Sequence, residues 1–299
     1  MFKIKTWISS FRLRTLPLAL STILMGSFLA IASGEYKASV IALSLTTTLL
    51  LQILSNIAND YGDGTKGTDN KNRLGPERAL QSGQISPGQM KTAIFAFALL
   101  SFISGVYLIL ESFGNELFPI LVFLLMGIAA IAAAIKYTVG TKAYGYSGLG
   151  DIFVFVFFGL TAVFGTYFLN TKKIDPDILL PAISMGLLST AVLNLNNMRD
   201  IKNDVASGKI TFAAKLGINK AKKYHLSLLS VAMVSAITYT RFNFTSGWNL
   251  VYLLSFPFFA IQLKNILRIK DEVLLDPYLK KLALTTLLFS ILFGIGLIL

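Results

Sequence analysis

Two short clusters of acidic and amide side chains are the parts of this chain best suited to chemistry. One occupies residues 56–63 and the other occupies residues 196–204. In each cluster an Asn precedes an Asp by four residues and a second Asp follows three or four residues later, so in a helix the three side chains lie on one face. Mg²⁺ favours such oxygen ligands and commonly shares them with substrate phosphates. The predicted metal ligands are Asn56, Asp60, Asp63, Asn196, Asp200 and Asp204.

The charge of the two clusters narrows the class of substrate. Their four aspartates, which we also expect to be the catalytic residues, carry −4 in total. They would repel a diphosphate, itself about −3, unless divalent cations lay between them. The loop after the first cluster contains glycines that let backbone N–H groups approach an anion, and Lys66 and Arg78 add positive charge there. These features favour a diphosphate-bearing substrate bound through Mg²⁺.

Long apolar segments must position these clusters. Of 299 residues 54% are hydrophobic and 14% are charged, and the mean hydropathy is +0.66. In lipid only helices and closed barrels satisfy their own backbone, and a helix of about 20 apolar residues crosses the hydrocarbon layer. We therefore expect an all-α, polytopic integral membrane protein with about nine transmembrane helices around a central cavity. The predicted spans are 15–33, 38–58, 92–111, 117–135, 152–169, 178–198, 224–240, 247–263 and 282–299.

The two clusters recur at corresponding positions along these spans. One ends the second span and the other ends the sixth, which suggests a single membrane-embedded domain, 1–299, with two four-helix halves at 15–135 and 152–263 and a ninth helix at 282–299. Both clusters would then reach the same face and oppose each other across the cavity, since bundles build sites from facing helices. The loops expected to cap this cavity are 59–91, 136–151 and 199–223.

The distribution of basic residues predicts the orientation. All but four of the 27 Lys and Arg residues lie on the side of the N-terminus, the exceptions being Lys37, Lys172, Lys173 and Arg241. We therefore expect a protein of the cytoplasmic (inner) membrane with its N-terminus and active site on the cytoplasmic side. The net charge of +12 could suggest nucleic acid, but a basic rim on an apolar bundle fits anionic lipid headgroups or an anionic substrate better. No nucleic-acid partner is expected, and the absence of Cys excludes thiolate catalysis.

Four motifs together give the chain a specific resemblance. They are Arg12-Leu13-Arg14-Thr15-Leu16-Pro17, the segment 59–69, Gly75-Pro76-Glu77-Arg78-Ala79 and Asn196-Asn197-Met198-Arg199-Asp200. Over essentially its full length the chain resembles the UbiA-type intramembrane prenyltransferase superfamily. Within that superfamily it is most similar to the enzymes that prenylate 1,4-dihydroxy-2-naphthoate in menaquinone synthesis.

This resemblance implies a reaction. A polyprenyl group would pass from polyprenyl diphosphate to 1,4-dihydroxy-2-naphthoate in a Mg²⁺-dependent step, with loss of CO₂ and diphosphate, to give demethylmenaquinol. Lipid-facing helices around the cavity would keep water away from the allylic cation. Lys142 departs from the family's Tyr-x-x-x-Lys element, because it follows Tyr137 by five positions instead of four. The implied diphosphate-binding residues are Lys66, Arg78, Lys142 and Arg199.

Two alternatives stay open at this point. The first is a different aromatic acceptor, such as 4-hydroxybenzoate, homogentisate or haem. The second is an ion-coupled transporter, because repeated helical halves with intramembrane acids also occur in that class. Transporter acids favour the middle of the bilayer, whereas these clusters lie at the ends of spans, and this difference favours the enzyme.

Overall fold

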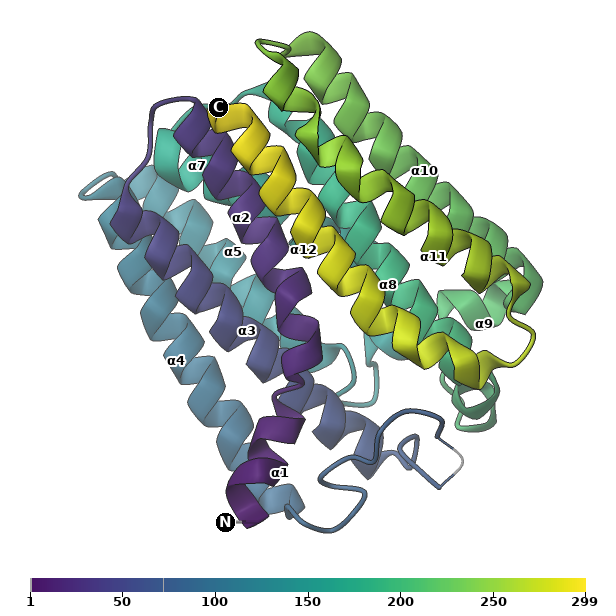
Figure 1. The fold of residues 1–299 in the computed structure, drawn as a ribbon. Coiled ribbons are helices and arrows are strands. Elements are labelled where there is room, and N and C mark those ends of the chain that lie inside the picture. The colour runs from purple at the N-terminus through teal and green to yellow at the C-terminus, as the bar shows by residue number, and fades with distance from the viewer. Residues whose placement is uncertain (1, 72) are drawn as a thin grey trace.

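The computed structural model describes residues 2–71 and 73–299, and within them it contains helices and no strand. The chain forms a bundle of long, roughly aligned helices (Figure 1). The main helices are α1 (Phe2–Ser10), α2 (Leu16–Ala32), α3 (Ala38–Thr65), α4 (Pro87–Phe113), α5 (Leu117–Lys136), α6 (Gly150–Val154), α7 (Gly165–Thr171), α8 (Leu179–Ala206), α9 (Phe212–Leu216), α10 (Ile218–Phe242), α11 (Phe256–Arg268) and α12 (Asp276–Ile298). Between α6 and α7 the segment η3 (Phe155–Phe164) is a π-helix, and η5 (Gly247–Ser255), a 3₁₀-helix, leads into α11.

The predicted all-α membrane fold is confirmed. In the part of the chain that the structure describes, eight helices are long and apolar enough to cross a membrane. The additional long helix is α10, which has 25 residues, is more polar, and carries Lys220, Lys222 and Lys223 in its first two turns. The predicted number of nine spans is therefore approximate. The N- and C-termini lie at opposite ends of the bundle (Figure 1).

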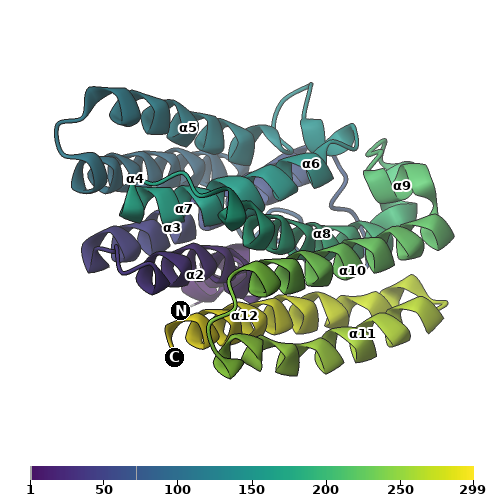
Figure 2. The same cartoon turned by 90° about the horizontal axis from the view of Figure 1, so that it is seen from above.

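The helix α8 lies at the centre of the bundle. It packs against α10, η3 and α12, and 18 of its residues are buried. Seen from above, α4 and α5 lie on one side of α8 and α11 and α12 lie on the other (Figure 2). The contact with η3 requires two glycines, because a Cβ on Gly159 would lie 2.6 Å from the carbonyl oxygen of Ala182 and 2.8 Å from Cα of Gly186. This close approach holds the π-helical segment against α8.

The helices that carry the two acidic clusters are longer than the apolar pattern predicts. The spans predicted to end at residues 58 and 198 belong to α3, which continues to Thr65, and α8, which continues to Ala206. Hydropathy locates the part of a helix that faces lipid, whereas the backbone continues in a helix for as long as its own hydrogen bonds are favourable. Both clusters thus lie within the last turns of helices, and the predicted loops 59–91 and 199–223 are shorter than expected. The division of the domain into two repeated halves stays a prediction.

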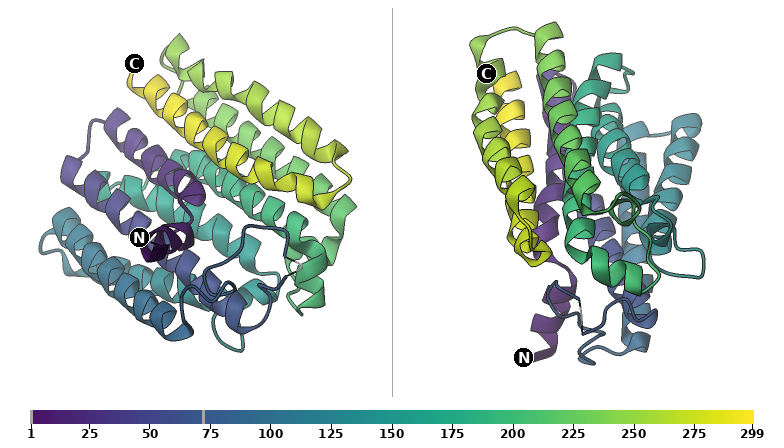
Figure 3. Two further views of the ribbon diagram at one scale, coloured as in Figure 1. Left: turned by 60° about the horizontal axis from the view of Figure 1, so that its bottom comes forward. Right: turned by 90° about the vertical axis from the view of Figure 1, so that its right-hand side faces the viewer.

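The segment between α3 and α4 gathers near α1 at one end of the bundle (Figure 3). It ends at a capping box, in which Ser86 accepts a hydrogen bond from the Gln89 backbone and the Gln89 side chain accepts one from the Ser86 backbone. Pro87 follows as the first residue of α4. This cap fixes where the segment must return to the bundle.

Candidate active site

The two acidic helices end in the same backbone motif. After α3, the N–H of Thr68 donates to the carbonyl of Asp63 at 3.0 Å, and Gly67 has a φ of 76°. After α8, the N–H of Lys209 donates to the carbonyl of Asp204 at 2.8 Å, and Gly208 has a φ of 74°. Both are Schellman motifs with glycine in the left-handed position. Asp63 and Asp204 therefore occupy equivalent positions, three residues before the cap of each helix.

These two helix ends meet at one ammonium group. The Nζ atom of Lys209 lies 3.3 Å from Oδ2 of Asp63 and 3.7 Å from Oδ1 of Asp204. A second link is the amide of Asn203, which donates to the carbonyl of Thr68 at 2.9 Å. The prediction that the two clusters face each other on one side of the bundle is confirmed by these contacts. Burial alone would lower the pKa of Lys209, but the charges of Asp63 and Asp204 outweigh burial and raise it.

Asp60 lies deeper and is held by two guanidinium groups. Arg12 forms a salt bridge with its Oδ1, and Nε of Arg78 lies 3.5 Å from the same oxygen. Arg12 sits at the break between α1 and α2 with a φ of 51°, a conformation that is costly for a residue with a side chain. This backbone turn brings the Arg12 side chain to the first acidic cluster.

Asp200 is paired within the protein. Its Oδ1 and Oδ2 accept hydrogen bonds from Nε and Nη2 of Arg199 at 2.9 and 2.5 Å. The Nη1 atom of Arg199 donates to Asp276 at 2.5 Å, and Arg14 lies 3.6 Å from Asp276. Arg199 is almost fully buried, with 1% of its surface exposed. Its guanidinium is thus committed to two carboxylates.

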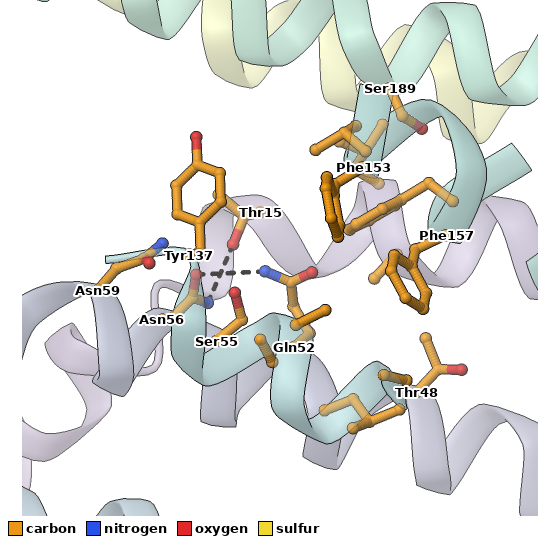
Figure 4. Close-up of a pocket in the computed structure, with 18 of the residues that line it drawn as sticks. Thr15, Thr48, Gln52, Ser55, Asn56, Asn59, Tyr137, Phe153, Phe157 and Ser189 are labelled. Atoms are coloured by element: carbon orange, nitrogen blue, oxygen red, sulfur yellow. Dashed lines mark hydrogen bonds between the residues drawn. The ribbon is translucent and has the colours of Figure 1, made fainter. Parts of the chain in front are cut away.

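The two predicted amide ligands are engaged differently. Asn56 donates to the carbonyl of Phe11 at 2.9 Å. It also donates to the hydroxyl of Thr15 at 3.3 Å and accepts from Gln52 at 3.2 Å (Figure 4). Asn196 accepts a hydrogen bond from Arg199 at 2.9 Å. Asn56 therefore joins α3 to the start of α2, whereas Asn196 belongs to the arginine network around Asp200.

A cavity of about 400 Å³ opens between these elements. Its charged lining includes Asp63, Asp200, Asp204 and Lys209. From there the wall becomes mainly apolar and continues toward the opposite end of the bundle, where Phe123 in the first half of α5 and Leu169 near the end of α7 line it. Phe153 and Phe157 lie along this wall, and Tyr137 and Asn59 lie near Asn56 (Figure 4). The shape suits a molecule with an anionic head and a long apolar tail.

The predicted residues do not all reach this cavity. Asp60 lines a second, smaller cavity of about 290 Å³, which shares Arg12 and Arg78 with the first. Lys66 is exposed, with its Nζ 4.0 Å from the centre of the Tyr146 ring, and Lys142 is exposed in the loop before η2 (Tyr144–Tyr146). The predicted site residues that do line the central cavity are Asn56, Asp63, Arg78, Asn196, Asp200 and Asp204.

The donor set fits a divalent cation. The Oδ2 atoms of Asp60, Asp69 and Asp204 are buried and have no hydrogen-bond partner in the described part of the protein, so these oxygens are free to ligate a cation. Among residues 2–71 and 73–299 no three acidic or histidine side chains are already gathered around one point. The carboxylates would therefore bind metal together with oxygens supplied by a substrate, as Mg²⁺ commonly does.

Several residues of the site were missed by the sequence analysis. Lys209 is the most important, and its only sequence signal is its place directly after the helix-ending Gly208. Tyr146 donates to Asp63 at 2.8 Å and exchanges a hydrogen bond of 2.6 Å with Thr68. Asp69 pairs with Arg73 at 2.8 Å, yet its burial raises its pKa. The contacts of Lys209 and Tyr146 with Asp63 connect segments far apart in sequence, so no local pattern indicates them, whereas Asp69 and Arg73 are only four residues apart.

The fold and site define a polytopic helical membrane protein whose two acidic helix ends share one polar-to-apolar cavity. The chain belongs to the UbiA prenyltransferase family, whose model matches residues 19–295. It is 45% identical over 298 residues to the 1,4-dihydroxy-2-naphthoate octaprenyltransferase of Haemophilus influenzae, covering 99% of this chain and 96% of that protein. It is 41% identical over 295 residues to the protein of the same name from Escherichia coli, covering 99% and 96%.

Solved structures show the same fold. A UbiA homolog from Archaeoglobus fulgidus bound to DMAPP and Mg²⁺ matches with a TM-score of 0.63 at 16% identity, over 96% of this chain and 98% of that one. The apo structure of a UbiA homolog from Aeropyrum pernix matches with a TM-score of 0.67 at 17% identity, over 95% and 96%. The helical architecture is therefore shared well beyond the closely similar relatives.

Proposed function

We propose that this chain transfers a polyprenyl group from polyprenyl diphosphate to 1,4-dihydroxy-2-naphthoate, releasing CO₂ and diphosphate and giving demethylmenaquinol. The observation that carries the proposal is the meeting of Asp63 and Asp204 at the polar end of a cavity whose other walls are mainly apolar. Two relatives that match nearly the whole chain at 45% and 41% identity carry the name of this activity with an octaprenyl donor.

We further propose that Mg²⁺ binds at the two acidic helix ends. Asp63 and Asp204 would hold it, with Asp60, Asp200, Asn56 and Asn196 as further ligands or supports, and a relative of the same fold has been solved with DMAPP and Mg²⁺. When bound, the metal would stabilise the negative charge that develops on the departing diphosphate. The unpartnered oxygens of Asp60 and Asp204 support this assignment.

The protein's own cations would complete the diphosphate site. Arg78 and Lys209 line the cavity and are the best placed to contact phosphate oxygens. Arg199 is bound to Asp200 and Asp276, so we assign it the role of orienting Asp200 instead of direct diphosphate binding. Lys66 and Lys142 are exposed at the rim, where they would attract the diphosphate over a longer range.

The apolar wall would protect the allylic carbon of the prenyl donor while the prenyl group is transferred. The C–O bond between the allylic carbon and the diphosphate breaks, and the electron-rich ring of the acceptor forms a new C–C bond at the carbon that carries its carboxylate. That carboxylate leaves as CO₂, and its bonding electrons restore the aromatic ring. Water would capture the allylic cation, so it must be kept out of the cavity. Apolar residues such as Phe153 and Phe157 would exclude water, and their ring faces would favour the positive charge of the cation (Figure 4).

We place the protein in the cytoplasmic membrane with the acidic clusters on the cytoplasmic side. The excess of Lys and Arg on the side of the N-terminus supports this orientation. The prenyl diphosphate would reach the cavity from the membrane, and the soluble aromatic acid would reach it from the cytoplasm. Anionic lipid headgroups are the expected neighbours of the basic rim.

A direct assay tests the proposal. Purified protein in lipid vesicles would be incubated with labelled prenyl diphosphate and one of four acceptors: dihydroxynaphthoate, 4-hydroxybenzoate, homogentisate or haem. We expect prenylated product and released CO₂ with dihydroxynaphthoate only, loss of both with EDTA, and recovery with excess Mg²⁺. Product with another acceptor instead would refute the assigned substrate, and ion-coupled flux without any product would refute the enzyme.

A further inference from the structure

One ammonium group lies between the two carboxylates to which we assign the metal. Lys209 is 7% exposed, and its Nζ contacts Asp63 and Asp204 at 3.3 and 3.7 Å. An ammonium and a divalent ion that both lie against these two carboxylates repel each other, because like charges at this distance interact strongly in a buried site. A metal that bridges the two helix ends would therefore favour movement of the Lys209 side chain away from them.

The backbone of Lys209 is fixed by hydrogen bonds, whereas its side chain borders the central cavity and has space to move into it. Its N–H is held by the carbonyl of Asp204 at 2.8 Å, and the N–H of Ile210 is held by the carbonyl of Tyr146 at 3.1 Å. The side chain lines the central cavity, and its Nζ lies 5.6 Å from the centre of the Tyr146 ring. A long lysine stem can thus turn into the cavity without any change in the helix ends.

Charge determines where the displaced ammonium finds a partner. Asp63, Asp204 and Lys209 together carry −1, and a divalent ion changes this sum to +1. An ammonium beside a metal is unfavourable unless an anion is also present. A diphosphate in the cavity would supply that anion, accepting hydrogen bonds from the ammonium and ligating the metal with other oxygens.

We propose that Lys209 is an internal cation that couples metal binding to diphosphate binding. Without diphosphate it competes with the metal for Asp63 and Asp204 and weakens metal binding. With diphosphate it turns to the phosphate oxygens, so metal and diphosphate strengthen each other's binding. This inference rests on the proposed function and adds to it a reason for the two ligands to bind together.

The test measures binding instead of turnover. Mn²⁺ affinity of the purified full chain is measured by electron paramagnetic resonance, and geranyl thiolodiphosphate binding is measured with and without saturating Mn²⁺. The coupling factor is the thiolodiphosphate affinity with saturating Mn²⁺ divided by the affinity without it. By thermodynamic linkage, thiolodiphosphate must change the affinity for Mn²⁺ by the same factor. Lys209→Met removes the charge and Lys209→Arg retains it. Lys215→Met is the matched control, because the Lys215 ammonium donates to the carbonyl of Ser147 at 2.6 Å and Lys215 is not among the residues that line the central cavity.

We expect Lys209→Met to bind Mn²⁺ alone about fivefold or more tightly than the wild type, with a coupling factor reduced about fivefold or more. Lys209→Arg and Lys215→Met should retain wild-type coupling. Wild-type Mn²⁺ affinity and coupling in a folded Lys209→Met variant would overturn the inference while leaving the proposed function intact. If Lys209→Met fails to fold, Lys209→Gln takes its place under the same criterion. Absence of Mn²⁺ binding in every variant, wild type included, would overturn the inference together with the proposed metal.

Discussion

Asp63 and Asp204 are structural equivalents that face the same ammonium. Each lies three residues before the cap of its helix, each carbonyl accepts the N–H that closes a Schellman motif, and each carboxylate contacts Lys209. Two helices from different parts of the chain thus deliver one carboxylate each to a shared point. The relationship explains why neither acidic cluster alone would make a site.

The first prediction concerns this pair. Asp63→Asn and Asp204→Asn should each lower kcat by about a hundredfold or more, since a metal contributes several kcal/mol and each ~1.4 kcal/mol is a factor of ten. The double variant should lose little more than either single variant, because both remove the same bound metal. Steady-state prenyl transfer measures this, with Asp177→Asn as control, since Asp177 contacts Asn243 at the other end of the bundle. Full turnover in the double variant would contradict the assignment.

The second prediction concerns the stability supplied by Arg199. Replacing it by Met leaves Asp200 buried without its partner, which costs about 3–5 kcal/mol in comparable cases. We expect a clear fall in the Tm of the detergent-solubilised protein, and a smaller fall for Asp276→Asn, because Asp276 is more exposed. If Arg199 instead binds diphosphate directly, Arg199→Met should keep its Tm and raise the KM for the prenyl diphosphate.

The third prediction uses two glycines of α3 as a matched pair. A Cβ on Gly62 would lie 2.7 Å from the backbone carbonyl carbon of Thr138, whereas a Cβ on Gly64 would meet the side chain of Leu80, whose flexible tip is nearest at 2.6 Å. Thr138 holds its loop against α3 by donating to the carbonyl of Ala58 at 3.1 Å. Gly62→Ala should therefore lower the free energy of unfolding by about 1–3 kcal/mol. Gly64→Ala should unfold close to the wild-type temperature, and equal losses in both would refute this account.

The fourth prediction concerns pH and the opposite end of the bundle. Lys172 follows α7 in a left-handed conformation, and burial lowers its pKa from 10.5 to about 8, with the charge of Lys37 acting in the same direction. Between these two values the unfolded chain binds more protons than the folded protein, so stability should rise as pH increases from about 8 to 10.5. Thermal unfolding across this range should show the rise in the wild type and a smaller one in Lys172→Met. An identical pH profile in the variant would contradict the assignment to Lys172.

Much of the site could be predicted from residue types and spacing. The spacing of Asp60 and Asp63, and of Asp200 and Asp204, indicated helix faces, and the apolar spans between them indicated a membrane bundle with both clusters at one end. These features are local, because side-chain periodicity and hydropathy depend on a few neighbouring residues. The sequence by itself therefore determined the class of fold, the acidic helix ends and the need for cations.

The tertiary structure decided which groups share a carboxylate. It placed Lys209 between Asp63 and Asp204, brought Arg12 to Asp60, and committed Arg199 to Asp200 and Asp276. Lysine and arginine side chains are long and flexible, so a position in the sequence does not determine which acid they reach. That choice depends on how helices from distant segments pack, because a buried charge is stable only where packing brings it an opposite charge.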